Sequence, residues 1–555
     1  MDFRTLVEVY SELEATQATL EKTEILADLF VAAADDMLPR LVDLVRGQVF
    51  RDWESADLGV STSLAQEAIS KATGVDTDRI EHWWREEGDL GSAAAIAMSN
   101  RTQRTLLDAQ LDVETVHDTL QDLAAYSGEG SQAKRVDAIA GLLTHTEPDE
   151  ARYLVRTVLG TMRLGVGAGL VRDALAEALL DGSAEAIAAI ERGYEVTNDF
   201  GIVATRARKA SREGLEDLDV RLFRPIKPML AHKAEDLSTA LQELGDAEGV
   251  VLLETKYDGI RAKLHRRDDE IRMFTRRLED VTEQFPDVIE AAHDSLGSVD
   301  YIVEAEVVGR DPETGRTVPF QQLSQRIKRK YDIPRLAQEI PVSVYVFDLL
   351  YVDGSSLLNR PLGERLEQLE SMLGPVGESF RRAEYLRTDS LAAARDFYEM
   401  AVDGGHEGIM VKNLDATYQP GSRVGYQLKV KTTMEPLDLV VTRVKWSEGR
   451  KSGFLGRPYL ACRDTSDGSL CEVGRMHTGF TDNDLEEFTD LVEPLIREVK
   501  GREAELSPEI VLEVSFEEIQ ASPTYNSGYA LRFPRFERIR HELGPEDADT
   551  LERVE

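Results

Sequence analysis

The segment ETKYDGIR, residues 254–261, combines residue types that could perform covalent chemistry at a phosphate. It reads as the end of one strand, a tight turn and the start of a second strand, with Lys256, Asp258, Gly259 and Arg261 at or beside the turn. A protonated lysine is a poor nucleophile, and desolvation or neighbouring cations lower the pKa of such a group and free the amine. Glycine lets the backbone approach a phosphate or a sugar closely. The pattern predicts a nucleophilic Lys256, and the alternative is a hairpin that is merely basic.

The chain around this segment is strongly acidic. Its 555 residues carry a formal net charge of −38, the sequence pI is near 4.7, and arginine outnumbers lysine. At about 150 residues per domain, the length suggests roughly three domains. Strong acidity suits a cytoplasm crowded with salt, where self-repulsion is screened and carboxylates hold water and cations. We therefore expect a halophilic source, with an ordinary solubility bias as the alternative.

Several classes of protein are disfavoured by simple counts. The two cysteines, Cys462 and Cys471, cannot form a four-cysteine zinc site. They flank RDTSDGSL, whose Asp-Gly pair predicts a hairpin, and we expect them to be buried in a reduced cytoplasm. The N-terminal stretch lacks a basic region and an apolar core, so we expect no signal peptide, and no run approaches the length of a membrane span.

Residues 1–220 are predicted to be helical, because apolar residues recur at helical spacing in stretches such as LVEVYSELEATQATLEKTEILADLFVAA. Within this part, RLGVGAGLVRDAL places Gly165, Gly167 and Gly169 between two helices, with Arg163 beside them. Such glycines could expose backbone amides to a phosphate at a helix N-terminus. A tight helix–helix turn explains them equally well, and the sequence leaves both open.

Strands dominate after a Pro-bounded stretch that begins near residue 224. Runs such as YIVEAEVVG, VSVYVFDLLYVDG and GYQLKVK, separated by helical segments such as LGERLEQLESML, predict a mixed α/β (α+β) domain over residues 221–433. Residues 434–555 predict a small all-β unit of about five strands, for which a barrel is the natural arrangement. One helix is expected within it, at DNDLEEFTDLVEPLIREV, residues 482–499.

ETKYDGIR resembles the active-site signature of the covalent nucleotidyltransferases, which comprise ATP-dependent DNA ligases, RNA ligases and mRNA capping enzymes. The order and spacing of the later motifs, with RLGVGAGLVRDAL and KPMLA before the lysine, are most similar to the ATP-dependent DNA ligases of archaea and eukaryotes. The resemblance extends over nearly the whole chain. It implies a multidomain protein with an all-α DNA-binding domain at 1–220, a nucleotidyltransferase (adenylation) domain at 221–433 and an OB-fold β-barrel at 434–555.

The same resemblance implies an activity. Lys256 would carry AMP, taken from ATP, through a phosphoramidate bond, and the AMP would activate the 5′-phosphate of nicked double-stranded DNA for sealing. Replication, repair and recombination would be the cellular roles. With the acidic composition, the resemblance indicates a halophilic archaeon as the source and a monomeric, nucleoid-associated cytoplasmic enzyme.

By resemblance, the motifs also assign residues to the nucleotide. Glu254 would contact the adenine side and Arg261 the ribose, and FTRRLEDVT places Arg276 near the sugar and the nick. YVFDLLYVDG places Phe347 where an aromatic ring stacks on adenine. Without the resemblance, a Phe in an apolar strand would be read as ordinary core.

Two acidic motifs point to a metal. YIVEAEVVG resembles the strand that usually ends in Asp-Gly-Glu, so Glu306 matches the functional carboxylate and Glu304-Ala305 replaces Asp-Gly. HEGIMVKNL supplies Glu407 as a metal carboxylate and Lys412 close to the phosphates. Carboxylate oxygens are ligands that Mg²⁺ prefers. We therefore expect Mg²⁺, or another divalent cation, at Glu306 and Glu407.

Basic residues are expected to bind the phosphates of ATP and DNA. Lys429 and Lys431 would, with Arg261, also form the cationic surroundings of Lys256. The last motif, LRFPRFERIRHELGPED, carries a cluster of arginines that in the family orients the leaving pyrophosphate. The full set is Arg423, Lys429 and Lys431 for the triphosphate, Arg532, Arg535, Arg538 and Arg540 for pyrophosphate, and Arg163, Arg277, Lys328 and Arg329 for DNA.

The chain departs from the family pattern at two positions. Gln427 stands where the family usually has Trp, and Leu543 stands where it has the closing Lys. Leu543 removes a positive charge that should help pyrophosphate to leave, so both departures put the efficiency of the first step in doubt.

Alternative functions are kept open. An RNA ligase or capping enzyme shares the lysine motif but generally lacks a helical domain of this size ahead of it. An NAD-dependent ligase carries a cysteine zinc site, which two cysteines cannot supply. A catalytically inactive clamp that binds nicks would fit Gln427 and Leu543, but not an intact Lys256. A sliding clamp is considered as a further partner, although no convincing Gln-x-x-Leu/Ile-x-x-aromatic-aromatic motif is found.

Overall fold

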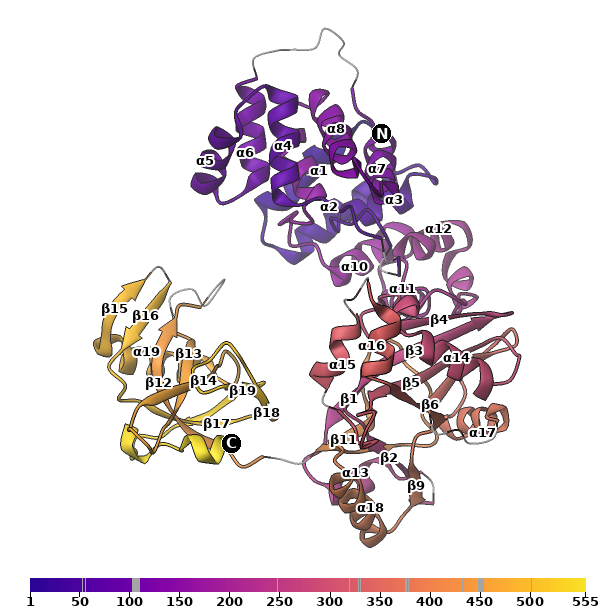
Figure 1. Ribbon diagram of the computed structural model, residues 1–555. Helices are drawn as coiled ribbons and strands as arrows, with labels where there is room; N and C mark the ends of the chain where they lie inside the picture. Colours follow the sequence, from indigo (N-terminus) through magenta and orange to yellow (C-terminus); the bar gives the residue numbers. More distant parts are fainter. Residues whose placement is uncertain are drawn as a thin grey trace. The chain divides into compact units, whose positions relative to one another are not determined.

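The computed structural model describes residues 1–555 except 52, 55, 102–109, 247, 319, 328, 330, 375–376, 378, 432–433, 448–453 and 501 (Figure 1). The chain divides into two units, Met1–Val430 and Lys431–Glu555. None of the described helices combines the length and the apolar character needed to cross a bilayer.

Helices occupy the N-terminal part of the first unit, as the sequence predicts. In the first helix, Phe3, Leu6, Tyr10 and Leu13 are buried at intervals of three or four residues, which places them on one face. Several of these helices begin where a side chain accepts a backbone N–H, as Asp89 does from Ser92. The helices are α1 (Phe3–Ala15), α2 (Thr19–Ala32), α3 (Leu38–Leu44), α4 (Thr62–Thr73), α5 (Thr77–Glu87), α6 (Leu90–Ser99), α7 (Val113–Asp122), η1 (Leu123–Ala125), α8 (Ser131–Thr144), α9 (Pro148–Val158), α10 (Ala168–Leu179), α11 (Ala184–Thr197) and α12 (Phe200–Glu216).

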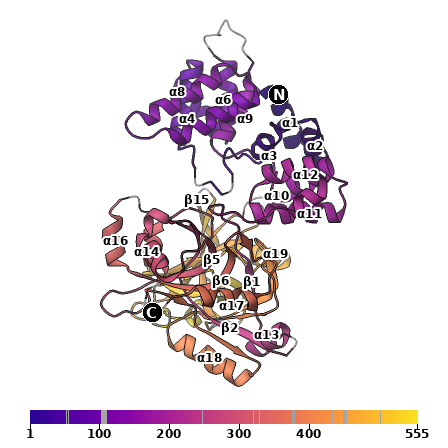
Figure 2. The ribbon, with the colours of Figure 1, turned by 90° about the vertical axis from the view of Figure 1, so that its right-hand side faces the viewer.

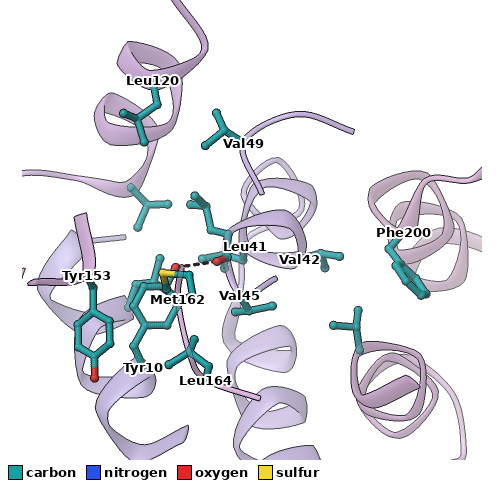
Figure 3. Packing of buried hydrophobic residues seen from close by; sticks show 14 of the residues in the cluster. Tyr10, Leu41, Val42, Val45, Val49, Leu120, Tyr153, Met162, Leu164 and Phe200 are labelled. Carbon is teal, nitrogen blue, oxygen red and sulfur yellow. Dashed lines mark hydrogen bonds between the residues drawn. The ribbon is translucent and has the colours of Figure 1, made fainter. Parts of the chain in front are cut away.

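Tyr10 lies within the core that these helices share (Figure 3). Its hydroxyl donates a hydrogen bond to the carbonyl oxygen of Leu44 at 3.1 Å, and its ring centroid lies 5.2 Å from that of Tyr153. Burial, with the neighbouring Tyr153, raises the pKa of Tyr10 well above its ordinary value. Figure 3 shows Met162 and Leu164, from the Gly-rich segment, beside this tyrosine. The apolar side chains of that segment therefore anchor it to the helical core.

The Gly-rich segment forms the tight turn between α9 and α10. Arg163 and Gly165 both have left-handed backbone, with φ of 60° and 68°. The Arg163 guanidinium donates to the carbonyl oxygen of Gly88 at 3.0 Å, and the buried Lys22 donates to that of Leu164. These contacts support the helix–helix turn, and phosphate binding at the segment stays a prediction.

The rest of the first unit is a mixed α/β arrangement of two sheets, as predicted. The five-stranded sheet has the order β1-β11-β10-β2-β9, and the six-stranded sheet has the order β4-β3-β5-β6-β7 with β8 beside β6. The strands are β1 (Leu230–Lys233), β2 (Val251–Lys256), β3 (Ile260–Arg267), β4 (Glu270–Thr275), β5 (Tyr301–Gly309), β6 (Val342–Val352), β7 (Ser355–Ser356), β8 (Phe380–Arg382), β9 (Tyr385–Thr388), β10 (Gly408–Lys412) and β11 (Arg423–Lys431). The helices are α13 (Leu237–Leu244), η2 (Thr282–Gln284), α14 (Pro286–Ser295), α15 (Phe320–Ile327), α16 (Ile333–Glu339), α17 (Leu362–Met372) and α18 (Leu391–Asp403).

The turn after Lys256 crosses from one sheet to the other. β2 pairs with β10 and β9, whereas β3 pairs with β4 and β5. The two strands around the turn are therefore predicted correctly, but the alternative of a simple basic hairpin is wrong. A Cβ on Gly259 would lie 2.4 Å from the carbonyl oxygen of Val307 in β5, so this close approach of two backbones requires glycine.

The alternation of side chains along β2 determines which face of the sheet carries Glu254 and Lys256. Leu253 packs with Leu241 of α13 and Phe397 of α18, and Figure 2 shows these two helices beside β2. Leu252 instead belongs to the core of the six-stranded sheet. Because residues two apart share a face of a strand, Glu254 and Lys256 lie on the face of Leu252, away from α13 and α18.

The second unit is rich in strands. A seven-stranded sheet has the order β14-β13-β12-β16-β15, with β17 between β12 and β20, and β18 and β19 form a separate pair. The elements are β12 (Leu437–Lys445), β13 (Arg457–Arg463), β14 (Leu470–Arg475), α19 (Asp482–Val492), η4 (Glu493–Leu495), β15 (Ile496–Lys500), β16 (Glu503–Leu506), β17 (Val511–Ser515), β18 (Glu518–Ala521), β19 (Tyr529–Arg532), β20 (Arg535–Ile539), η5 (Pro545–Asp547) and α20 (Leu551–Val554). The predicted five strands are too few, because strands of four or five residues give little alternation to read.

Two local predictions in this unit have opposite outcomes. Cys462 and Cys471 face each other across the β13–β14 hairpin as buried free thiols, as expected. The helix predicted over residues 482–499 ends at Val492, and its last part is the strand β15. Pro494 has no backbone N–H and cannot continue a helix, which accounts for the break.

We expect Gly259→Ala to destabilise the first unit by more than about 2 kcal/mol, because the added methyl group would force β5 away from the turn. Gly425→Ala in β11 is the matched control, since a Cβ there meets nothing within 4 Å. Hydrogen exchange of peptides from β3 and β5 in the full chain measures both variants. Equal protection in the two variants would contradict the close approach.

Candidate active site

Lys256 lies at the end of β2, opposite Gly408 of β10. Its ammonium group donates a hydrogen bond to the carboxylate of Glu407, and both side chains are 21% exposed. The backbone N–H of Glu407 also donates to the carbonyl oxygen of Lys256 at 3.1 Å. The sequence predicts cations around Lys256, whereas the structure places a carboxylate against it. The lysine is thus held at a fixed position and remains open to solvent.

Glu306 brings a second carboxylate toward Lys256. It lies on β5, directly opposite Arg261 of β3 in the strand register. Burial raises the pKa of Glu306 to about 7; Lys256 and Arg261 oppose this rise, and Glu407 and Asp258 add to it. The Glu306 side chain lies against Gly259 of the turn and Glu407 pairs with Lys256, so both carboxylates lie at the turn that also carries Asp258.

This donor set fits a divalent cation. A buried carboxylate with other carboxylates near it gains from a bound positive charge. Glu306 and Glu407 offer oxygen ligands only, which suits Mg²⁺, an ion that proteins usually hold through one or two carboxylates together with substrate phosphates. Among the described residues, no group of three or more His, Cys, Asp or Glu could hold a metal without such help.

Arg261 is fixed by a buried carboxylate. Glu304 of β5 accepts hydrogen bonds from Arg261 at 2.7 Å, Lys263 at 2.6 Å and the Tyr418 hydroxyl at 2.9 Å. Burial would raise the pKa of Glu304, but Arg261 and Lys263 outweigh it and hold the pKa at about 2. The other side of the Arg261 guanidinium donates to the carbonyl oxygen of Met229 at 2.8 Å. The residue predicted to meet the ribose is therefore held on two sides.

Phe347, predicted to stack on adenine, lies on β6 and is partly buried. The Arg261 guanidinium lies 5.4 Å from its ring centroid, and the Lys412 ammonium lies 4.8 Å from it. Tyr345, two residues earlier on the same strand, stacks on Tyr257 with 3.9 Å between the ring centroids. Tyr257, Tyr345 and Phe347 thus form an aromatic cluster next to Lys256 in the chain.

Glu254, predicted to lie on the adenine side, is buried on β2. Its two carboxylate oxygens pair with different cations, Arg382 at 2.6 Å and Lys412. Burial would raise the pKa of Glu254, but Lys412 and Arg382 outweigh burial and lower it. The carboxylate is therefore ionised and fixed.

Most of the other predicted cations of the first unit are more exposed to solvent than Arg261. Arg276 and Arg277 follow β4 and are exposed, as are Arg163 and Arg329. Arg423 begins β11 and donates to the carbonyl oxygen of Ala231 at 3.0 Å. Lys429 is half-buried in the same strand, and Lys328 lies outside the described residues.

In the second unit, most of the predicted cations have acidic partners. Lys431 pairs with Glu517 at 3.2 Å, Arg532 with Glu518 at 2.8 Å and Arg538 with Glu513 at 2.8 Å. Arg540 pairs with Asp438 at 2.6 Å and with Glu542 at 2.7 Å, and Arg535 is exposed on β20. The predicted cluster is therefore largely neutralised within its own unit.

The two residues that depart from the family pattern, Gln427 and Leu543, are both packed against other parts of the protein. Gln427 is buried in β11. Leu543 packs against a small apolar cluster of Val440, Val511 and Ala548. A leucine at position 543 therefore contributes to packing where a lysine would contribute charge.

Sequence reasoning missed the residues that hold the predicted ones in place. Lys263, Arg382 and Tyr418 each bond a buried carboxylate of the site. Lys263 lies two residues after Arg261, so its side chain shares that face of β3, and this spacing could have revealed it. Arg382 and Tyr418 lie more than a hundred residues from their partners and gave no local signal.

Comparison with known families gives matches along the chain. The family described as "DNA ligase N terminus" matches residues 2–176. "ATP dependent DNA ligase domain" matches residues 228–431, and "ATP dependent DNA ligase C terminal region" matches residues 451–543. The three matches follow the order of the helical part, the two-sheet part and the second unit.

Curated relatives cover the full length. The chain is 41% identical to the DNA ligase of Thermococcus onnurineus over 554 residues, which is 100% of this chain and 97% of that protein. It is 41% identical to the DNA ligase of Methanopyrus kandleri over 555 residues, covering 100% and 98%. The solved structure Pmar-Lig_Pre. has a similar fold, with a TM-score of 0.57 and 18% identity over 97% of this chain and 99% of that chain. The chain belongs to the family of ATP-dependent DNA ligases.

Glu306 should make stability depend on pH. When the folded-state pKa of a carboxyl group is raised, the group contributes its full stability at a pH below its ordinary, unfolded-state pKa. That contribution is lost as the pH rises through the folded-state pKa, which is about 7 for Glu306. Glu306→Gln has no ionisable carboxyl group at this position, so its stability does not fall with pH for this reason. Relative to wild type, we expect the variant to gain on the order of 1 kcal/mol between pH 5 and pH 8, after allowance for solvent screening.

Thermal unfolding in EDTA across this pH range measures the effect, because chelation keeps divalent cations from binding the wild type. Glu248→Gln, at an exposed carboxylate of the same unit, is the control. Parallel stability curves for wild type and Glu306→Gln would contradict the assigned environment.

Proposed function

We propose that the protein seals nicks in duplex DNA through a covalent lysyl-AMP intermediate on Lys256, with ATP as the source of AMP. The observation that carries the proposal is the pairing of Lys256 with Glu407 beside Glu306, at the turn where the two sheets meet. Membership of the ligase family along the whole chain supports it.

The proposed reaction has three phosphoryl-transfer steps. The neutral amine of Lys256 attacks the α-phosphorus of ATP; the P–N bond forms, the α–β P–O bond breaks and pyrophosphate leaves with the electron pair. Glu407, which accepts the lysine hydrogen bond, is placed to take up the proton that the ammonium must lose. An oxygen of the 5′-phosphate at the nick then displaces the lysine nitrogen from phosphorus. Finally the 3′-hydroxyl attacks that 5′-phosphate, and AMP leaves.

Glu306 and Glu407 would hold Mg²⁺ or another divalent cation. The metal would supply positive charge against the phosphate oxygens as charge develops on them. The remaining work is positioning: Arg261 would hold the ribose, and Phe347 would support the base.

Further residues are proposed to contact the substrates. Glu254 and Arg276 would complete the nucleotide site of an adenylation domain at 221–433. Arg423, Lys429 and Lys431 would bind the triphosphate. From an OB-fold domain at 434–555, Arg532, Arg535 and Arg540 would orient pyrophosphate, and this requires Arg532 and Arg540 to exchange their acidic partners for phosphate. A helical domain at 1–220 would bind DNA with Arg163, and Arg277, Lys328 and Arg329 would add DNA contacts.

We further propose that the enzyme works in a salt-rich cytoplasm of a halophilic archaeon, as a nucleoid-associated monomer in replication, repair and recombination. A chain with a net charge of −38 must bind a polyanion through a local surface. At high salt, counterion release contributes little, so shape and backbone hydrogen bonds must carry more of the affinity. A sliding clamp remains a partner to be tested by direct binding.

The salt proposal gives a simple expectation. Between 1 and 3 M KCl, chosen as about the range of a salt-rich cytoplasm, the logarithm of the affinity for nicked DNA should fall with a slope shallower than about −2 against the logarithm of salt. Fluorescence anisotropy with a nicked duplex measures it. A steep slope, of the kind that six or more phosphate contacts give in dilute salt, would show that ordinary electrostatic binding operates.

The proposed function is tested by covalent labelling. In high KCl with Mg²⁺ and α-labelled ATP, we expect wild type to retain label on a denaturing gel and to lose it to nicked DNA as the nick is sealed. Lys256→Ala should lose at least a thousandfold in labelling, because the nucleophile is absent. Lys233→Ala, at an exposed lysine on β1, is the matched control and should label normally.

Two results would contradict the proposal. Wild type that binds nicks but takes no label would point to an inactive clamp. Label that discharges to RNA ends or capped 5′ ends, and not to nicked DNA, would point to an RNA ligase or a capping enzyme.

A further inference from the structure

Glu407 lies in a short, glycine-rich connection that joins the end of α18 at Asp403 to the start of β10 at Gly408. Gly405 and Gly408, on either side of His406 and Glu407, have left-handed backbone with φ of 81° and 134°. Glycine loses more conformational freedom on folding than any other residue. A connection of this composition therefore needs further contacts to fix where the Glu407 carboxylate lies.

His406 supplies a side-chain contact next to Glu407. Its ring packs edge-on against the ring of Tyr257, with 4.8 Å between the ring centroids and 70° between the ring planes. Tyr257 follows Lys256 in the chain, and Lys256 pairs with Glu407. The residue after the lysine thus meets the residue before the carboxylate, and two side-chain contacts join the end of β2 to this connection.

Tyr257 is itself held on two sides. It is 6% exposed, and its ring stacks on that of Tyr345 in β6 with 3.9 Å between the centroids. Its hydroxyl accepts a hydrogen bond from the backbone N–H of Glu384 at 3.1 Å. Tyr345 is held in turn, because its hydroxyl accepts a hydrogen bond from the Arg381 guanidinium at 3.1 Å. The ring that meets His406 is therefore a fixed part of the protein core.

The contact bears on the geometry of the reaction. The backbone N–H of Glu407 donates to the carbonyl oxygen of Lys256, and this bond aligns the two backbones without setting the direction of the Glu407 side chain. A fixed ring at position 406 limits the backbone rotations that would carry the carboxylate away from the lysine. Such rotations matter, because misplacing a reacting group by about 1 Å can cost a hundredfold in rate.

We propose that His406 is a positioning residue: by packing against Tyr257, it holds the Glu407 carboxylate against Lys256 while the lysine is adenylated. The proposal rests on the proposed function, because it assumes that Lys256 attacks ATP. In this role the imidazole acts as an aromatic ring, and its nitrogens have no part in the transfer. An aromatic side chain without nitrogens should therefore work in its place.

The experiment measures formation of the covalent adduct by the full chain in a single turnover, in high KCl with saturating Mg²⁺ and a range of ATP concentrations. It gives the rate constant at saturating ATP and the ATP concentration at half of that rate. His406→Ala removes the ring, whereas His406→Phe keeps one. Tyr257→Leu removes the ring on the other side of the contact. His293→Ala, at an exposed histidine on α14, is the matched control.

We expect His406→Ala to lower the rate constant at saturating ATP by roughly ten- to a hundredfold and to keep the half-saturating ATP concentration within about threefold, because ATP still binds while Glu407 is misplaced. His406→Phe and His293→Ala should stay within about threefold of wild type in both quantities. Tyr257→Leu should repeat the effect of His406→Ala. Combining these two should add little, because both remove the same contact.

The proposal is overturned if His406→Ala keeps the wild-type rate constant, or if His406→Phe is as slow as His406→Ala, because the ring nitrogens would then be required. It is also overturned if the loss falls on the half-saturating ATP concentration alone, or if the effects of His406→Ala and Tyr257→Leu multiply. Tyr257→Leu decides the question if His406→Ala does not fold. A wild type that forms no adduct overturns the proposed function and this proposal with it, whereas the other results leave the proposed function standing.

Discussion

Buried charge at the junction of the two sheets is the constraint on which the active-site region depends. Glu254 and Glu304 are almost fully buried carboxylates, and each is held by two cations. Removing one partner from such a group leaves an uncompensated charge and typically costs about 3–5 kcal/mol, so the partners must stay in register. Through Arg382 and Lys412 the first carboxylate ties β2 to β8 and β10, and through Arg261 and Lys263 the second ties β5 to β3.

Lys256, Glu306 and Glu407 lie at the turn between the two sheets. There one lysine pairs with Glu407 while a second carboxylate, Glu306, lies nearby. Burial raises the pKa of Glu306 to about 7, so a negative charge on this carboxyl group is costly without a compensating cation. A divalent cation would supply that compensation, and it would in turn favour the phosphates that bring AMP to the lysine in the proposed reaction. Glu254 and Glu304 thus hold neighbouring strands in register, while Glu407 and Glu306 lie at the turn that follows Lys256.

Much of this could be predicted from the sequence, because the relevant signals are local. Helical spacing in the first part and the strand–turn–strand around Lys256 follow from short stretches, and motif resemblance singles out Glu407, which pairs with Lys256. What could not be predicted depends on pairing between distant strands. The turn at Gly259 links two sheets rather than forming a hairpin, and no local pattern distinguishes these arrangements.

Partners that are distant in sequence explain the remaining differences. Arg382 lies 128 residues from Glu254, and Asp438 lies 102 residues from Arg540, so neither pair could be anticipated from spacing. The helix predicted through Val499 is too long because its apolar pattern continues past Pro494 into a strand. In each case a contact between distant residues or a proline decides the structure, and neither is visible in the local apolar pattern.

The most direct test of the account is to locate the covalent adduct. The full-length protein would be incubated with ATP and a divalent cation in high salt, digested under conditions that preserve phosphoramidates, and analysed by peptide mass spectrometry with and without nicked DNA. We expect AMP on the peptide that contains Lys256, and we expect it to be lost when nicked DNA is added. AMP on another residue, or none on this peptide although the nick is sealed, would contradict the assignment of the sheet junction as the catalytic centre.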